Sequence, residues 1–94
     1  MVISDENKKF LEGLLQYYID QADSYNQFAK EYSKFSSSKK EIAFGVIVGT
    51  VYSAFLQTYS NQQLEVRLDD IQEFHEFMRD NIHKITNALD EKKV

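Results

Sequence analysis

The chain has 94 residues, of which 43% are hydrophobic and 28% charged, a size and composition typical of one folded globular domain rather than a disordered segment. It contains no cysteine, which excludes disulfides, thiolate zinc sites and a cysteine nucleophile. Its 11 basic and 15 acidic residues give a net charge of −4, so we expect no binding to the phosphate backbone of nucleic acids.

The chain ends and the turn residues set the expected location and fold class. The first ten residues, MVISDENKKF, lack a basic region followed by an apolar run and a small-residue cleavage site, so no secretory signal and a cytoplasmic location are expected. Proline is absent and there are only three glycines, so the turn residues that sheets need are missing. We predict a single all-α domain over residues 1–94.

The first predicted helix spans residues 4–35. Apolar side chains recur there at alternating steps of four and three, which is the spacing of one helical seam. The seam consists of Leu11, Leu15, Tyr18, Ala22, Tyr25, Ala29 and Tyr32. A second stripe beside it consists of Phe10, Tyr17, Phe28 and Phe35. Together they form an apolar face wide enough to contact two neighbouring helices.

The second predicted helix spans residues 39–60. Ser38 and Glu41 have the spacing of a capping box, in which each side chain accepts a free backbone N–H of the first turn. The helix is expected to end within residues 59–63, where Ser60 and Gln63 again have capping-box spacing. Since no proline or glycine interrupts this region, the sequence also allows the second helix to continue into the third.

The middle of this helix, IAFGVIVGTVYSAFL, contains no charged residue over positions 42–56. A membrane span needs about 20 apolar residues, whereas this run of 15 residues would extend only about 22 Å. The residues that follow are mostly uncharged polar ones, which fit poorly in lipid. We therefore expect no membrane span, and interpret the stretch as a helix that must be covered by protein on all sides.

One side of this helix carries bulky residues and the other carries a ridge of small residues. The small-residue ridge is Gly45, Gly49 and Ser53, bordered by Ile42 and Leu56. Small residues four apart allow the backbone of another helix to approach closely. A second copy of the chain could cover the ridge across a two-fold axis, so these five residues are the predicted interface of a homodimer. The alternative is that another helix of the same chain covers the ridge.

The third predicted helix spans residues 64–91 and carries an a/d heptad pattern over nearly four heptads. The pattern consists of Leu64, Leu68, Ile71, His75, Met78, Ile82, Ile85 and Leu89. Phe74 and Phe77 widen this apolar face. The expected architecture is three long antiparallel helices, which assemble as a dimeric six-helix bundle.

Acidic residues on the third helix suggest a possible site. Glu73, Glu76, Asp80 and His83 are spaced three, four and three apart, so they share one helical face that could hold a divalent cation with help from Asp20 and Asp23. The face is nearly opposite the heptad seam, where charged side chains are normally solvated.

The sequence contains no phosphate-binding glycine loop, nucleophile elbow or two-histidine zinc motif. We therefore predict no catalytic, cofactor or metal residue. The expected function is a non-enzymatic interaction and assembly module that self-associates and binds a protein partner. The alternative function is a metal-dependent hydrolase that uses the acidic face of the third helix.

Overall fold

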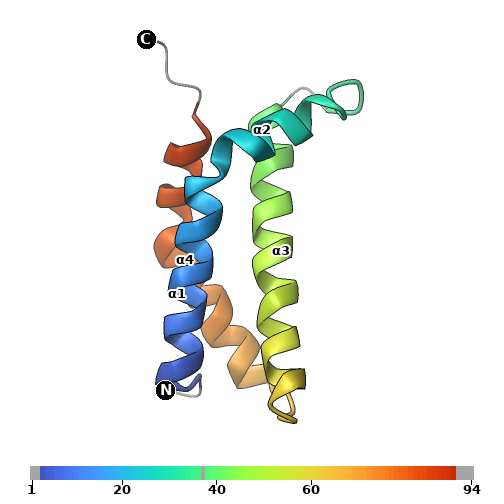
Figure 1. Cartoon of the computed structure of the whole chain (residues 1–94). Helices are drawn as coiled ribbons and strands as arrows, with labels where there is room; N and C mark the ends of the chain where they lie inside the picture. The colour runs from blue at the N-terminus through green and yellow to red at the C-terminus, as the bar shows by residue number, and fades with distance from the viewer. Residues whose placement is uncertain (1–2, 37, 91–94) are drawn as a thin grey trace.

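The computed structural model describes residues 3–36 and 38–90, and these form four helices and no strand (Figure 1). The helices are α1 (Asp5–Asp20), α2 (Ala22–Lys30), α3 (Lys39–Asn61) and α4 (Leu68–Leu89). In Figure 1, α1 and α4 run in one direction, α3 runs in the opposite direction, and α2 crosses one end of the molecule. The prediction of an all-α fold is confirmed.

The first predicted helix, over residues 4–35, is divided in the structure. It breaks at Gln21, whose N–H donates to the carbonyls of both Tyr17 and Tyr18. The chain then continues as α2, which ends at Lys30, and a series of tight turns carries it on to Phe35. The prediction of one uninterrupted helix was therefore wrong.

Packing explains the break at Gln21, because no proline or glycine is present there. The bend lets α2 turn away from the direction of α1 (Figure 1), with the small side chains of Ala22 and Ala29 buried in the core. It also places the Asn26 amide 3.0 Å from the carbonyl oxygen of Leu89, to which it donates a buried hydrogen bond. Tertiary contacts of this kind override the local preference for a straight helix.

The second and third predicted helices are separate. Ser38 is the N-cap of α3, as predicted, and its hydroxyl oxygen accepts the N–H of Glu41 at 3.1 Å. After Asn61 the chain turns through Gln63, which has a positive φ of 59°. Helix α4 begins at Leu68 rather than at residue 64, with the Arg67 N–H donating to the Asp70 carboxylate at 2.9 Å. Residue 91, where the third helix was predicted to end, lies outside the described residues.

The centre of the core is a cluster of aromatic rings between α3 and α4. The ring of Phe55 lies 4.9 Å from those of both Tyr59 and Phe74, and the Tyr52 ring lies 5.2 Å from that of Phe74. Helix α3 contributes a buried row at every fourth position. This row consists of Ala43, Ile47, Val51, Phe55 and Tyr59. The opposite side of α3 consequently faces away from the core.

The buried face of α4 differs from the predicted heptad seam. Met78, Ile85 and Leu89 are buried as expected, but Leu68 and Ile82 are 69% and 43% exposed. Their places in the core are taken by other residues of the helix. These are Asp70, Phe74 and Phe77. A strict seven-residue pattern drifts by about 20° per heptad around a straight helix, so only part of the seam reaches the core.

Polar contacts join the helices at the end of the molecule opposite α2. Near the start of α1, the amides of Asn7 and Gln62 exchange two hydrogen bonds of 3.0 and 2.9 Å. The N–H of Ile3 donates to Glu73 at 3.0 Å. These contacts fix the relative heights of α1, α3 and α4.

Candidate functional site

The outer side of α3 carries a shallow groove formed by its small residues. Gly45, Gly49 and Ser53 are exposed, and a Cβ atom added at either glycine would meet nothing within 4 Å. We call this surface the α3 groove. It is lined by Gly45, Val46, Gly49, Thr50, Ser53, Ala54 and Gln57. All of these residues belong to α3, so no other described element covers the groove.

The structure therefore places three of the five predicted interface residues on an open surface. Ile42 and Leu56 differ, because each is partly buried and packs against the core cluster. The alternative interpretation, in which another helix of the same chain covers the small-residue ridge, is wrong for the described residues.

Helix α3 is unusually apolar for a helix with so much uncovered surface. In its most apolar 18-residue window, only 28% of the residues are buried. Its 23 residues make it long and apolar enough to cross a membrane by length and composition, and it is the one such helix among the described residues. The whole helix extends about 34 Å, whereas the sequence argument counted only its strictly apolar part.

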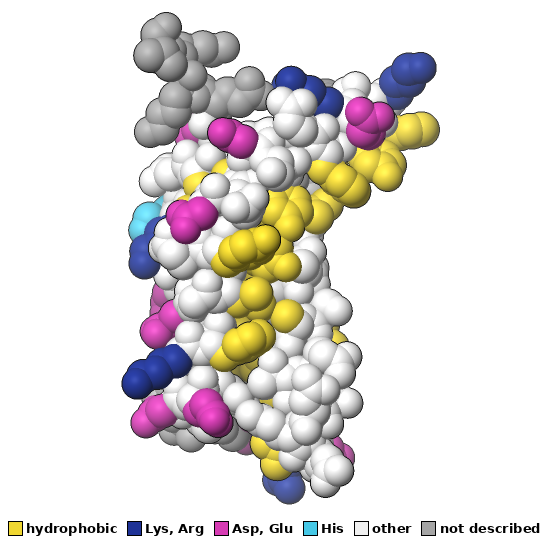
Figure 2. All heavy atoms as spheres, in the orientation of Figure 1, with side chains coloured by type: hydrophobic (Ala, Val, Ile, Leu, Met, Phe, Trp, Pro, Cys, Tyr) yellow, Lys and Arg dark blue, Asp and Glu magenta, His cyan; other side chains and the backbone are white. Residues whose placement is uncertain are grey.

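A second apolar surface lies on α1, α2 and the turns after α2. Its members are aromatic side chains with exposed fractions from 43% to 83%. We call it the aromatic stripe. It consists of Phe10, Tyr17, Phe28, Tyr32 and Phe35. Figure 2 shows a band of hydrophobic side chains that follows α1 and continues onto α2 beside α3. The sequence grouped most of these residues in a helix-packing stripe, but no described helix covers them.

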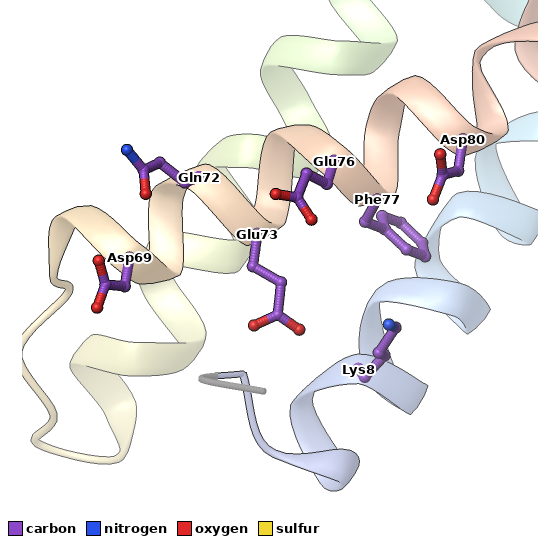
Figure 3. Close-up of a pocket in the computed structure, with 7 residues that line it drawn as sticks. All are labelled: Lys8, Asp69, Gln72, Glu73, Glu76, Phe77 and Asp80. Atoms are coloured by element: carbon purple, nitrogen blue, oxygen red, sulfur yellow. The ribbon is translucent and has the colours of Figure 1, made fainter.

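The acidic residues predicted on the third helix line a groove of about 430 Å³ between α4 and the start of α1 (Figure 3). Glu73, Glu76 and Asp80 all contribute, but Lys8 of α1 lies in the same groove. The carboxylates are spread along the helix in Figure 3, and that of Glu73 points toward the N-terminal segment. Glu73 thus serves in part to bind the backbone of Ile3.

The structure does not bring together the residues of the possible cation site. His83, Asp20 and Asp23 do not line this groove. Asp20 instead accepts a hydrogen bond from Gln16, at 2.9 Å, on the surface of α1. Among residues 3–36 and 38–90, no group of three or more His, Asp or Glu side chains could hold a metal ion.

A buried polar contact that the sequence did not predict joins the C-terminal end of α3 to the first turn of α4. The Tyr59 hydroxyl hydrogen-bonds to Asp70, and both residues are 4% exposed. Burial raises the pKa of Tyr59 to about 12, with further contributions from this hydrogen bond and from the charges of Asp70 and Glu73. The Asp70 carboxylate also accepts the Arg67 N–H, so it supports the start of α4.

The raised pKa of Tyr59 predicts a loss of stability in alkali. An unfolded chain releases the phenol proton near pH 10, whereas the folded chain holds it up to about pH 12. Above pH 10 the unfolded state therefore binds fewer protons, and the free energy of unfolding should fall by up to about 1.4 kcal/mol per pH unit. This stability is fully present below pH 10.

Urea unfolding between pH 9 and 12 measures the effect as the difference between the wild type and Tyr59→Phe. Tyr32→Phe is the matched control, because Tyr32 is exposed and its loss should leave the wild-type alkaline dependence unchanged. Parallel pH profiles for the wild type and Tyr59→Phe would contradict the assignment.

Comparison of the chain with protein-family models, with curated proteins and with solved structures gives no match.

Proposed function

We propose that the protein is a small non-enzymatic assembly module that forms a homodimer through the outer side of α3 and can also engage a protein partner. The observation that carries this proposal is the uncovered α3 groove. An apolar helix in water needs cover on every side, and the described residues leave the side of Gly45, Gly49 and Ser53 open. A dimer would contain eight helices rather than the predicted six, because the first predicted helix is divided into α1 and α2.

The glycines themselves support a partner. Glycine inside a helix costs about 1 kcal/mol relative to alanine, and neither Gly45 nor Gly49 has the positive φ that only glycine adopts easily. Among the described residues of one copy, no atom occupies the space that their missing side chains leave. Close approach of a second chain would explain why small residues occupy these positions.

Cover by protein is favoured over cover by lipid because of what packs beside α3. Helix α1 lies alongside α3 and carries charged residues through much of its length. Asn7 bonds to Gln62, and the two antiparallel helices rise equally, so Glu12 lies near the level of Gln57. A membrane-spanning α3 would draw such charges into the hydrocarbon, at a cost of several kcal/mol. We therefore propose a protein that is soluble without detergent.

Gly49→Leu tests the proposed interface. The added side chain would fill the α3 groove and separate the two chains, so we expect the dimer dissociation constant to rise at least about tenfold, or about 1.4 kcal/mol. Sedimentation equilibrium over a concentration series measures this constant. The fold should persist, since a Cβ atom added there meets nothing within 4 Å and leucine favours helix more than glycine does.

Asn87→Leu is the matched control, because it adds an exposed leucine to α4 rather than to α3. Its dissociation constant should stay close to that of the wild type. Equal weakening by both variants, or none by Gly49→Leu, would contradict an interface on the α3 groove.

The alternative function, a metal-dependent hydrolase, has no specific observation in its favour. The acidic side chains are spread along α4 and share their groove with Lys8. Calorimetric titration with magnesium or manganese tests this alternative independently of the dimer.

A further inference from the structure

The aromatic stripe and the α3 groove lie on the same face of the molecule. Val46, Thr50 and Ala54 line the groove at every fourth position, and Thr58 continues their row along α3. Thr58 and Phe10 together line a recess between α3 and α1. The groove therefore opens on the side of α3 that meets α1, which is the side where the stripe begins.

Along α1 and α3 the two surfaces lie side by side, one on each side of the boundary between these helices. The reciprocal bonds between Asn7 and Gln62 fix the register of the antiparallel helices. Tyr17 lies ten residues further along α1 and Ser53 nine residues back along α3, so the two are near the same level. A bulky residue of the stripe is thus level with a small residue of the groove.

The exposed area of this face suits a stable contact with another chain. Aromatic side chains bury about 150–250 Å² each, so the five residues of the stripe leave about 500 Å² uncovered at their exposed fractions of 43% to 83%. A standard interface takes about 800 Å² from each partner. The stripe supplies more than half of that area, and the adjoining α3 groove adds seven more residues.

The middle of the face carries no charge. Helix α3 has no charged residue from Ile42 to Asn61, and Gly13 and Leu14, which share the helical face of Phe10 and Tyr17 in α1, are uncharged, whereas Glu6 lines the recess beside Phe10 at one end. A charged partner surface would lose its hydration here without gaining an opposite charge. An apolar partner with bulky residues beside small ones would fit, and a second copy of this chain has that surface.

We infer that the aromatic stripe of each copy docks into the α3 groove of the other. Consider a two-fold axis that lies in the interface and runs parallel to the helices. It exchanges the α1 side of one copy with the α3 side of the other and leaves each residue at the same level along the helices. It therefore brings each stripe over the partner's groove, so that both contacts form at once. An axis perpendicular to the helices would instead place the two aromatic stripes on each other and the two α3 grooves on each other. This inference rests on the proposed self-association and names the surface that meets the α3 groove.

Cysteine cross-linking between two full-length variants tests this arrangement, because the wild-type chain contains no cysteine. One protein carries Tyr17→Cys and the other carries Ser53→Cys with an added affinity tag. Both positions are exposed, so each variant should fold. The two proteins are mixed, treated with a short bis-maleimide, and the mixed dimer is identified by its size. We expect on the order of tenfold more cross-linking than in a mixture of Tyr17→Cys with His83→Cys, which reports random collision.

The controls separate this inference from the proposed function. The wild type could sediment as a dimer while Ser53→Cys alone cross-links as well as the mixture. The two α3 grooves would then face each other, which overturns the stripe-to-groove arrangement but leaves self-association standing. Equal cross-linking of the mixture and the collision control in a protein of dimeric mass would overturn the arrangement in the same way. A wild type that is monomeric at every concentration would overturn both proposals.

Discussion

Phe74→Ala is expected to lower the free energy of unfolding by about 3–5 kcal/mol, the range typical of a large aromatic side chain removed from a core. Phe74 is 0% exposed, and its ring packs against Phe55 and Tyr52 at centroid distances of 4.9 and 5.2 Å. The alanine variant would leave a cavity at the contact between α3 and α4. Domains of this size have total stabilities of about 5–15 kcal/mol, so this variant should lose a large part of its stability.

Ile82→Ala is the matched control on the same helix. The heptad pattern places Ile82 in the core and Phe74 beside it, whereas the structure leaves Ile82 43% exposed. Its replacement should cost less than about 1 kcal/mol. Urea unfolding monitored by circular dichroism compares the two variants. Equal losses would show that the heptad seam, and not the observed face of α4, packs against the core.

Asp70→Ala is expected to cost about 2–3 kcal/mol, the second largest effect of a single substitution. The alanine would leave the Tyr59 hydroxyl buried without its carboxylate acceptor, and it would remove the acceptor of the Arg67 N–H at the start of α4. An unsatisfied buried polar group costs about 1–3 kcal/mol, and loss of a capping contact costs about 1 kcal/mol.

Asp69→Ala controls for the general effect of a negative charge in the first turn of α4, because Asp69 is adjacent and exposed. It should change stability by about 0.5 kcal/mol or less. A double-mutant cycle with Tyr59→Phe isolates the contact and should give a coupling of at least about 0.5 kcal/mol. Additive losses would mean that Asp70 and Tyr59 act independently.

The fold class and the start of α3 were predictable from sequence because both depend on local chemistry. The missing turn residues excluded sheets, and Ser38 supplied the cap that the serine-to-glutamate spacing implies. The break at Gln21 was not predictable in this way. It depends on contacts such as the bond from Asn26 to Leu89, between residues 63 positions apart in the chain.

The rotated face of α4 shows a limit of periodicity. A seven-residue repeat predicts an apolar seam but not which part of it reaches the core, and here the larger Phe74 and Phe77 are buried in preference to Leu68. The partnership of Tyr59 with Asp70 was equally hidden, since the sequence gives no sign that a first-turn aspartate is buried.

The small-residue side of α3 was recognisable from composition, and the interface proposed there stays a prediction. A helix that is uncharged after Glu41 and carries two glycines one turn apart needs an explanation in any helical fold, and the structure leaves that side of α3 open. The aromatic stripe was recognised in sequence as an apolar face, but its exposure was not. Only the position of α1 and α2 relative to α3 shows that no described helix covers it.

If a second copy of the chain covers the α3 groove, the wild type should be a dimer in detergent-free solution, and its molar mass there shows whether it is. Sedimentation equilibrium over a range of micromolar concentrations should give twice the chain mass of 11.0 kDa, with dissociation toward 11.0 kDa on dilution. A mass of 11.0 kDa at every concentration in that range would contradict the proposed homodimer.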